Sequence, residues 1–393
     1  MNLSDRVRRV RPSPTLAVTA KAAELRAAGR DIISLGAGEP DFDTPKHIGE
    51  AGIQAIRDGF TRYTAVEGIV ELRQAIKDKL QTEQGLEYGL DQIIVSTGGK
   101  QSIFNLCQAL LNPGDEAIIS APYWVSYPDM VRLAGGEPVI VSAGQDQGFK
   151  MTPRQLAAAI TDKTRLVMLN SPSNPTGVAY TREDWGQLAD VLRDHPEIVI
   201  ATDDMYEKIL WADEPFSNIA MVAPDLVPRT VVLNGVSKAY AMTGWRIGYA
   251  AGPADLIKAM KVLQSQSTSG ACSIAQKAAC EAIAGDQSEI DAMVAAFHER
   301  HDYVVEALND LPGVTCLSGQ GAFYSFPDVS AAMKALGIAD DVAFSEHLLE
   351  EAGVAVVPGS AFGAPGHVRL SYATSLDALR EAIERIRAVL SAA

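Results

Sequence analysis

Residues 231–248 read Val231-Val232-Leu233-Asn234-Gly235-Val236-Ser237-Lys238-Ala239-Tyr240-Ala241-Met242-Thr243-Gly244-Trp245-Arg246-Ile247-Gly248. The first three residues form a short apolar run that predicts a buried strand. Lys238 follows this strand closely, where loss of water would lower its pKa toward that of a nucleophilic amine. Arg246, eight residues further on, carries a planar guanidinium that suits a phosphate. A lone lysine is usually a solvated surface residue, so the surrounding motifs must decide its role.

Similar apolar runs precede this one along the chain. Each run is continuously hydrophobic, as expected of strands in a parallel sheet that is covered on both faces. Longer amphipathic segments separate them, for example at 102–111, 153–160 and 182–192, and this alternation predicts an α/β fold with right-handed crossovers. The expected strands are 93–95, 117–119, 139–141, 166–169, 198–200 and 231–233.

The C-terminal third predicts a smaller α/β domain. The isolated strand signal at 32–35 indicates that the N-terminal segment joins it. We expect residues 1–47 to form an N-terminal arm and part of the small domain, 48–285 a large domain, and 286–393 the rest of the small domain. The expected small-domain elements are helices at 286–312, 341–352 and 376–390, strands at 354–357 and 368–372, and the apolar segment 322–326.

Composition excludes several classes of protein. The 393 residues are 47% hydrophobic and 21% charged, which rules out a disordered, collagen-like or coiled-coil chain. The net charge of −15 argues against binding to nucleic acid or to an anionic membrane. No signal peptide or membrane-spanning stretch is evident, and a cytoplasmic location is expected. The four cysteines lack a pairing pattern and predict reduced, mostly buried thiols: Cys107, Cys272, Cys280 and Cys316.

Ligands of doubly wound sheets bind beyond the carboxyl ends of the strands, so the residues that follow each strand matter most. Gly98, Gly99 and Lys100 follow the strand at 93–95 and open directly into a helix. Backbone N–H groups there could bind an anion, aided by the helix dipole. A tight turn with a solvated lysine explains the same residues equally well.

Two further strand ends carry polar side chains. Asn174 precedes Pro175, which holds it extended in a rigid turn. Asp203 follows the strand at 198–200, and a buried carboxylate there is costly unless a cation faces it. A protonated ring nitrogen would serve, although a helix N-cap is the alternative role. Tyr206 lies three residues further on.

Together these groups match the needs of pyridoxal phosphate: a lysine, a partner for the pyridine nitrogen, and a phosphate site. Residues 235–248 resemble the lysine signature of class-I, fold-type-I aminotransferases. Further motifs in the same order resemble the bacterial aspartate aminotransferase branch, and the resemblance covers nearly the whole chain. They lie at 36–42, 62–64, 121–128, 264–269, 321–324 and 367–372.

The resemblance implies a fold and a set of roles for the cofactor. The fold would be a mainly parallel seven-stranded sheet in a large α/β/α domain, plus a smaller α/β domain. Lys238 would hold the cofactor as a Schiff base and later shuttle a proton. Asp203 would keep the pyridine nitrogen protonated, while Tyr206 and Asn174 would bond the ring oxygen. Trp124 would stack on the ring, although most tryptophans are ordinary buried aromatics.

The remaining implied roles concern the phosphate and the substrate. Gly98, Gly99, Lys100 and Arg246 would surround the phosphate, and Arg369 would bind the substrate α-carboxylate beside the Gly38 backbone. Tyr63 would reach the phosphate of a neighbouring subunit, which implies a homodimer with shared active sites.

At two positions the roles known in the family do not carry over directly to this chain. Some family members have a serine three residues before the lysine, but this chain has Gly235, so Ser237 or backbone groups would bind the phosphate instead. Ser237 could equally cap a helix. Lys100 has two candidate roles, at the phosphate or at the distal carboxylate of the substrate, the latter with help from the arm around Arg11 and Thr15.

The sequence therefore predicts a pyridoxal-phosphate-dependent aminotransferase that moves the amino group of L-aspartate to 2-oxoglutarate. Aromatic, alanine or prephenate specificity and a β-lyase on the same fold are the alternatives, with a non-catalytic ligand sensor behind them. His298 and His301 share a helix face, but a metal site needs more ligands, so no metal is expected. The Gly-x-Gly at 36–38 lacks the third glycine of a dinucleotide fingerprint, which excludes NAD.

Overall fold

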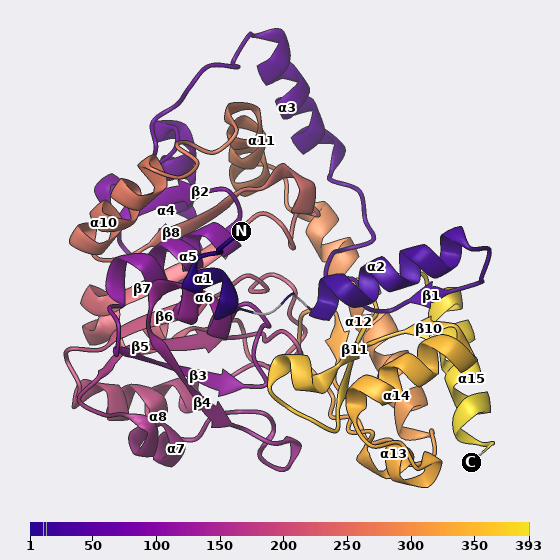
Figure 1. The fold of residues 1–393 in the computed structure, drawn as a ribbon. Coiled ribbons are helices and arrows are strands. Elements are labelled where there is room, and N and C mark those ends of the chain that lie inside the picture. The colour runs from indigo at the N-terminus through magenta and orange to yellow at the C-terminus, as the bar shows by residue number, and fades with distance from the viewer. Residues whose placement is uncertain (11, 13, 393) are drawn as a thin grey trace.

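The computed structural model describes residues 1–10, 12 and 14–392, and of residues 14–16 it describes the backbone alone. A seven-stranded sheet in the order β2-β8-β7-β6-β5-β3-β4 forms the centre of the larger half of the molecule (Figure 1). All pairings are parallel except those of β8, so the predicted mainly parallel sheet is confirmed. Its strands are β2 Ile93–Ser96, β3 Glu116–Ala121, β4 Glu137–Ser142, β5 Thr164–Asn170, β6 Val199–Asp203, β7 Thr230–Gly235 and β8 Gly248–Ala251.

Strand β8 is the one member of this sheet that the hydrophobic pattern does not predict. It reads Gly-Tyr-Ala-Ala, without the β-branched residues that characterise strands. Its four residues are buried and pair antiparallel with both β2 and β7. Tertiary pairing therefore makes this segment a strand where local preference does not.

Helices cover both faces of the sheet. One apolar layer joins α5, α6 and α10 to residues such as Ile94 and Leu233, and the layers on the opposite face involve α4, α7, α8, α9 and α11. Helix α3 packs on α11 (Figure 1). The bounds are α3 Lys46–Arg57, α4 Val70–Gln84, α5 Gly99–Leu110, α6 Tyr127–Ala134, α7 Pro153–Ala159, α8 Arg182–Arg193, α9 Ile219–Val222, α10 Ala254–Ser265 and α11 Ser273–Ala284.

The smaller half has its own apolar core, which is built largely from residues 293–390 and also includes Leu35, Tyr206 and Ile209. Strand β1 pairs parallel with β10, as the isolated signal at 32–35 predicts, while β11, β12 and β9 form an antiparallel sheet. The domain boundaries after residues 47 and 285 stay predictions. The elements are β1 Ile33–Ser34, α12 Ser288–Asn309, β9 Tyr324–Ser325, α13 Ser330–Leu336, α14 Asp341–His347, β10 Val354–Ala355, β11 Val357–Pro358, β12 Val368–Ser371 and α15 Leu376–Leu390.

One small-domain prediction is wrong. Residues 354–357 do not form a single strand, because the chain passes from one sheet to another at Val356. β10 pairs with β1, and β11 pairs with β12. A continuous apolar run reports burial on both sides but does not report which strand is the partner.

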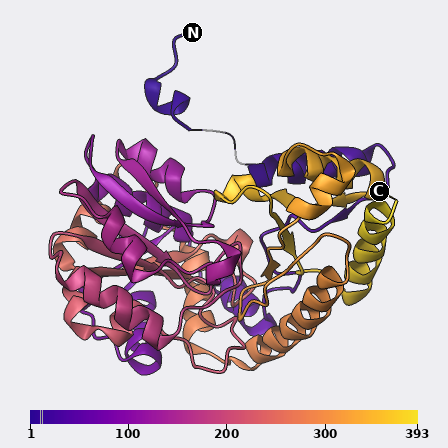
Figure 2. The same cartoon turned by 90° about the horizontal axis from the view of Figure 1, so that it is seen from below.

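The N-terminal segment comprises α1 Asp5–Arg8 and α2 Pro14–Ala27. In Figure 2 α1 stands out from the body of the molecule, while α2 lies along the small domain, where it contacts β10 and β11. Arg11 and the Thr15 side chain, for which a substrate role is expected, lie outside the described residues. No helix of the described residues has both the length and the hydropathy to cross a bilayer.

The cysteines differ in exposure. Cys107 and Cys316 are buried, which agrees with the predicted core thiols, and Cys280 is half-buried. Cys272 is exposed, so its assignment to the core is wrong. It precedes the first turn of α11, whose buried face begins three residues later.

Candidate active site

A cavity of about 410 Å³ lies beyond the carboxyl ends of the central strands, between the two halves of the molecule. Most of the predicted site residues line it, and they come from segments spread across most of the chain. Those that line it are Gly38, Gly99, Lys100, Trp124, Asn174, Asp203, Tyr206, Ser237, Lys238, Arg246 and Arg369. The strand-end argument predicts this place for the residues that follow β2, β5, β6 and β7, whereas Gly38, Trp124 and Arg369 are expected there from the family resemblance alone.

Lys238 follows β7, and its Nζ donates a hydrogen bond to the carbonyl oxygen of Gly38. Burial, helped by the positive charges of Arg369 and Arg246, lowers the pKa of the Lys238 ammonium to about 8, against the opposing effects of Glu39 and Asp203. An amine with this pKa can lose its proton near neutral pH, as a nucleophile or base must.

Asp203 ends β6, and its carboxylate faces the cavity. Tyr127 Oη donates to Asp203 Oδ2 at 2.5 Å, and the Met205 backbone N–H donates to Oδ1 at 3.3 Å. Burial raises the pKa of Asp203 to about 6 in spite of these donors and the charge of Lys238, which oppose the rise. Within the described residues no cation lies within ion-pair distance of Asp203, so a cationic ligand group would find a buried acceptor there.

Arg369 lies on β12 and is buried. Its Nη1 donates to Asn174 Oδ1 and its Nη2 to the Gly36 carbonyl, both at 2.9 Å. The guanidinium lies over the rings of Tyr324 and Phe362, at 4.5 and 5.0 Å from their centroids. Nε has no hydrogen-bond partner, and no carboxylate of the described residues forms an ion pair with it. A buried cation without a counter-ion indicates a site for an anion.

Tyr206 is fixed by an aromatic neighbour from the small domain. Its Oη and that of Tyr324 share a hydrogen bond at 2.9 Å. Burial and the neighbouring Tyr324 raise the pKa of Tyr206 well above its usual value, so the phenol stays protonated and can donate. Tyr206 thereby links the turn after β6 to β9.

Gly98, Gly99 and Arg246 lie together at the start of α5. Gly98 has φ +82°, and a Cβ there would lie 2.1 Å from Arg246 Nη2, so the close approach requires glycine. Arg246 Nη1 donates to the Thr243 carbonyl at 2.7 Å, and its guanidinium forms no ion pair with a described carboxylate. A helix N-terminus beside an unpaired arginine has the donor chemistry that a phosphate needs.

The packing around Gly235 explains why this chain has no serine at that position. A Cβ at this position would lie 2.8 Å from the Ile247 carbonyl oxygen and 3.0 Å from Gly248 Cα. Strand β8 therefore packs against the position that a serine side chain would occupy. Ser237 lines the cavity two residues later.

Lys100 and Trp124 form one wall of the cavity. Lys100 Nζ lies 4.9 Å from the centroid of the Trp124 ring, and the ring packs edge-on against Tyr127. Burial lowers the pKa of Lys100, and the charge of Arg246 lowers it further. Tyr63, by contrast, does not join the site of its own chain, because its side chain is fully exposed.

Three contributing residues have no role in the sequence prediction: Tyr127, Asn170 and Tyr324. Tyr127 holds the carboxylate of Asp203, and Asn170 donates to the Asp203 carbonyl at 2.8 Å and accepts from the Asn174 backbone N–H. Asn170 ends β5, so the strand-end argument could have found it. Tyr324 lies in the other domain, and its approach to Tyr206 depends on tertiary structure alone.

A second cluster lies outside the cavity. His298, His301 and Asp302 have their ligand atoms within 4.8 Å of one another. Asp302 already accepts from His301 Nδ1 at 2.9 Å, and His298 stacks on Trp211. His298 Nε2 lies 3.6 Å from the same carboxylate, so one hydrogen bond, one longer polar contact and the ring stack on Trp211 hold the three side chains in place.

The cavity fits pyridoxal phosphate on its own chemistry. The crowding of Gly98 by Arg246 forms an anion cradle, Asp203 offers a buried acceptor for a protonated ring nitrogen, and Lys238 offers an amine of lowered pKa. These three features stand at separate points of one cavity. The fold and the site together define an aminotransferase of fold type I.

Comparison with known proteins supports the assignment to the aminotransferases. Residues 30–386 match the family model for class I and II aminotransferases, a pyridoxal-phosphate-dependent family, and the chain belongs to this family. It is 56% identical to an aspartate/prephenate aminotransferase of Nitrosomonas europaea, with 100% of each chain covered. It is also 56% identical to that of Cereibacter sphaeroides, with 98% of each covered.

Solved structures give the same result. The aspartate aminotransferase from Rhizobium meliloti superposes with a TM-score of 0.96 at 47% identity, covering 100% of this chain and 99% of that one. That from Thermus thermophilus with maleate gives 0.93 at 45% identity, covering 99% and 100%. The predicted family, fold type and aminotransferase activity are thereby confirmed.

Proposed function

We propose that this aminotransferase uses pyridoxal phosphate to move the amino group of L-aspartate to 2-oxoglutarate in two half-reactions. The observation that carries the proposal is the buried guanidinium of Arg369, which has no counter-ion among the described residues and faces the same cavity as Lys238. Both substrates offer an α-carboxylate to this position. Relatives at 56% identity carry the name aspartate/prephenate aminotransferase.

The cofactor would be held at both ends. Gly98, Gly99 and Arg246, with Ser237, would bind its phosphate, while Asp203 would accept from its ring nitrogen. Tyr206 and Asn174 would bond the ring oxygen, and Trp124 would cover the ring. When bound, the cofactor supplies an electron sink for the bonds of the substrate α-carbon.

Lys238 would then move the proton that the reaction requires. Its amine, once free, would take up the proton of the substrate α-carbon and would hold it for transfer to the cofactor. The pKa of about 8 permits both directions near neutral pH, because neither protonation state is strongly preferred. Arg369 orients the substrate by a two-pronged contact with its α-carboxylate.

Lys100 keeps its two candidate roles, since it lies in the cavity over Trp124 and near enough to Arg246 for their charges to interact. Binding of the distal carboxylate would favour dicarboxylic substrates, and the Thermus thermophilus relative was solved with maleate, a dicarboxylate. A Lys100→Gln variant separates the roles. If Lys100 binds the distal carboxylate, KM for aspartate rises while KM for alanine and the affinity for cofactor do not.

A homodimer with shared sites completes the proposal. Tyr63 is fully exposed in the single chain, and Ile56 and Val70 nearby in sequence are also exposed apolar residues. A tyrosine reaching the phosphate of a second copy would explain this exposure. Tyr63→Phe should then weaken cofactor affinity without altering the thermal stability of the isolated chain.

Prephenate is the alternative acceptor. The names of both 56% identical relatives include it, and it shares with 2-oxoglutarate an α-oxo acid and a distal carboxylate. The two acceptors can be compared directly by the rate at which each restores the cofactor after the first half-reaction.

The experiment is an absorption titration of the purified, cofactor-loaded protein. L-aspartate should abolish the visible band of the lysine-bound cofactor, and 2-oxoglutarate should restore it. Restoration by prephenate would add the second acceptor. If another amino acid but not aspartate abolishes the band, the substrate is wrong. Release of ammonia or pyruvate without an acceptor would instead indicate a lyase.

A further inference from the structure

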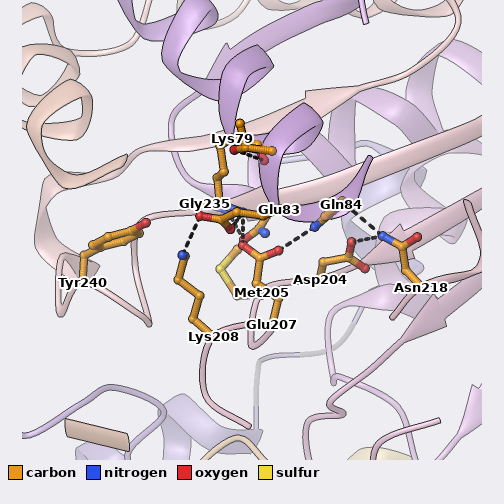
Figure 3. A network of polar contacts seen from close by, with 12 residues as sticks. Lys79, Glu83, Gln84, Asp204, Met205, Glu207, Lys208, Asn218, Gly235 and Tyr240 are labelled. Atoms are coloured by element: carbon orange, nitrogen blue, oxygen red, sulfur yellow. Dashed lines mark hydrogen bonds and ion pairs between the residues drawn. The ribbon is translucent and has the colours of Figure 1, made fainter. Parts of the chain in front are cut away.

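A chain of polar side chains lies behind the turn that carries Asp203 and Tyr206 (Figure 3). It links α4 to the turn at 204–208 and to the start of α9, and several of its members are almost wholly buried. Neither the sequence motifs nor the proposed reaction assigns it a role. Its members are Lys79, Glu83, Gln84, Asp204, Glu207, Lys208 and Asn218.

The contacts run without a break from one end to the other. Glu207 forms an ion pair with Lys79 and accepts from Gln84 Nε2 at 2.6 Å. Gln84 Oε1 in turn accepts from Asn218 Nδ2 at 3.3 Å, and the same amide donates to Asp204 Oδ2 at 2.6 Å. Glu83 extends the chain outward, since it pairs with Lys79 at 2.9 Å and with Lys208 at 2.8 Å.

Alternation along the backbone separates this network from the cavity. In a strand, successive side chains point to opposite faces, and in β6 Ala201 joins the layer of α5 and α6 while Ile200 joins that of α8. Asp203 shares the face of Ala201 and meets Tyr127 of α6. Asp204 turns the other way and accepts from Thr202 Oγ1 at 2.6 Å.

The turn after β6 also separates side chains that face the cavity from side chains that join the network. Asp203 and Tyr206 line the cavity, whereas Asp204 and Glu207 join the network. The backbone of the turn ties both sets together, because Glu207 N–H donates to the Asp204 carbonyl at 2.9 Å and Asp204 N–H donates to the Leu233 carbonyl at 2.8 Å. A shift of Asp204 or Glu207 therefore shifts the two cavity side chains.

A contribution to the stability of the fold does not by itself account for such a buried polar network. Replacing a buried ion pair by apolar residues of similar volume is often neutral or stabilising, because the desolvation of both ions opposes their attraction. Lys79 is 5% and Glu207 9% exposed. What a directional network supplies better than an apolar contact is a single geometry for the turn.

We propose that Asp204 and Glu207 are positioning residues, which the network of Lys79, Gln84 and Asn218 holds from behind so that Asp203 and Tyr206 keep their place against the cofactor. The inference rests on the proposed cofactor roles of Asp203 and Tyr206. It predicts that a change in the network, outside the cavity, alters the electronic properties of the bound cofactor.

The test variant is Gln84→Leu, which breaks the link between Glu207 and Asn218 without adding or removing a charge. The readout is the pH titration of the visible band of the cofactor-loaded protein. A donor at the ring oxygen and a proton on the ring nitrogen both favour the deprotonated form of the bond to Lys238, so misplacement of Tyr206 and Asp203 should raise the midpoint. We expect a rise of about half a pH unit or more, and a fall in kcat of about tenfold with KM less affected.

Two further variants make the result decisive. Asn218→Ser removes the donor to Asp204 and Gln84 but keeps a side-chain oxygen to cap α9, where Asn218 Oδ1 now accepts from Met221 N–H at 2.9 Å. Asn218→Ser should shift the midpoint in the same direction. It replaces Gln84→Leu as the test variant if Gln84→Leu does not fold. Thr230→Val is the control, because it removes one buried hydrogen bond at the far end of β7 and should lower the Tm while leaving the midpoint unchanged.

A lowered Tm with an unchanged midpoint and unchanged kcat in both network variants would overturn the inference and make the network purely structural. An equal shift in Thr230→Val would also overturn it, since general loosening would then be the cause. Failure of the proposed cofactor site, on which the inference rests, looks different. The parent protein would then show no visible cofactor band to titrate.

Discussion

The cavity and the network behind it both contain cationic side chains, but only the network pairs its cations with carboxylates. In the network Lys79 meets Glu83 and Glu207, and Lys208 meets Glu83. In the cavity four cations stand with two carboxylates, and within the described residues none of the four forms an ion pair. The cations are Lys100, Lys238, Arg246 and Arg369, and the carboxylates are Glu39 and Asp203.

The difference distinguishes a network whose cations are paired within the protein from a site that can accept an anionic ligand. Burial of a charge is costly in either region, and the network offsets that cost within the protein. In the cavity the buried guanidinium of Arg369 has no counter-ion among the described residues, so an anionic ligand can compensate its charge. Removal of a cavity cation should therefore affect function more than folding, and removal of a network cation the reverse.

Lys238→Ala should have the largest effect on activity. We propose that this amine holds the cofactor and moves the proton, so kcat should fall by about 10⁴-fold, the upper range for a general acid–base group. The Tm of the cofactor-free protein should stay within a few degrees of the parent, because the lost charge has no counter-ion in the described residues. Steady-state kinetics and a thermal melt of the same preparation test both statements, and ordinary turnover would refute the role of Lys238.

Lys79→Met should have the largest effect on stability. It leaves Glu207 buried without its cation, and removal of one partner from a buried ion pair costs about 3–5 kcal/mol. Chemical denaturation measures this loss. Lys277→Met is the matched control, since its pair with Glu71 is exposed and should contribute less than about 1 kcal/mol. Equal losses in the two variants would remove the distinction between network and surface pairs.

Asp203→Asn tests the cavity acid in two ways. In the loaded enzyme kcat should fall by about 10²–10³-fold, as when one preorganised electrostatic partner is lost; unchanged kinetics would refute the role of Asp203 at the ring nitrogen. In the cofactor-free protein the raised pKa of Asp203 determines how the stability changes with pH. The folded protein holds this proton up to about pH 6 and the unfolded chain to about 4, so the stability contribution is present below pH 4 and lost as the pH rises through 6.

The asparagine variant does not titrate. Its free energy of unfolding relative to that of the parent should therefore rise by up to about 3 kcal/mol between pH 4 and pH 7. Denaturation of both proteins across this range measures the difference. A constant difference would mean that Asp203 is ionised in the folded protein over the whole interval, and that a cation faces it.

Arg369→Lys keeps the charge and removes the planar fork. Loss of a charge-assisted contact costs about 1.5–3 kcal/mol, so kcat/KM for aspartate and for 2-oxoglutarate should each fall by about 10–100-fold. Cofactor affinity, measured by fluorescence quenching, should not change. A defect confined to cofactor binding would place the α-carboxylate elsewhere.

Particular elements show how far the sequence predicts this molecule. The apolar runs that become β2, β3, β5, β6 and β7 are largely buried on both faces, whereas β4, at the edge of the sheet, buries only Val141 fully. Helix α15 matches its expected bounds because one polar cap and one apolar stripe define it. Strand β8 and the break at Val356 are missed, since both depend on partners distant in sequence. Local pattern reports burial well and pairing poorly.

The candidate site divides in the same way. Residues at strand ends, such as Asp203 and Asn174, are predictable because the topology brings those ends together. Tyr127 and Tyr324 lie within motifs that resemble the family, yet their contacts with Asp203 and Tyr206 follow from tertiary packing alone. The network behind the site leaves no motif, because Asp204 and Glu207 alternate with the cavity residues along one turn and the other members lie on α4 and at the start of α9.

Gly235→Ser tests the smallest difference, the single position at which this chain departs from the family serine. A Cβ there would lie 2.8 Å from the Ile247 carbonyl, so the substitution must displace β8 and should cost about 1–3 kcal/mol, as overpacking does. Gly235→Ala adds the same Cβ without the hydroxyl and is the matched control. If the serine bound phosphate, Gly235→Ser would be closer to the parent in cofactor affinity than Gly235→Ala. Equal losses in both variants would show that the phosphate is held without this position, by the start of α5, Arg246 and Ser237.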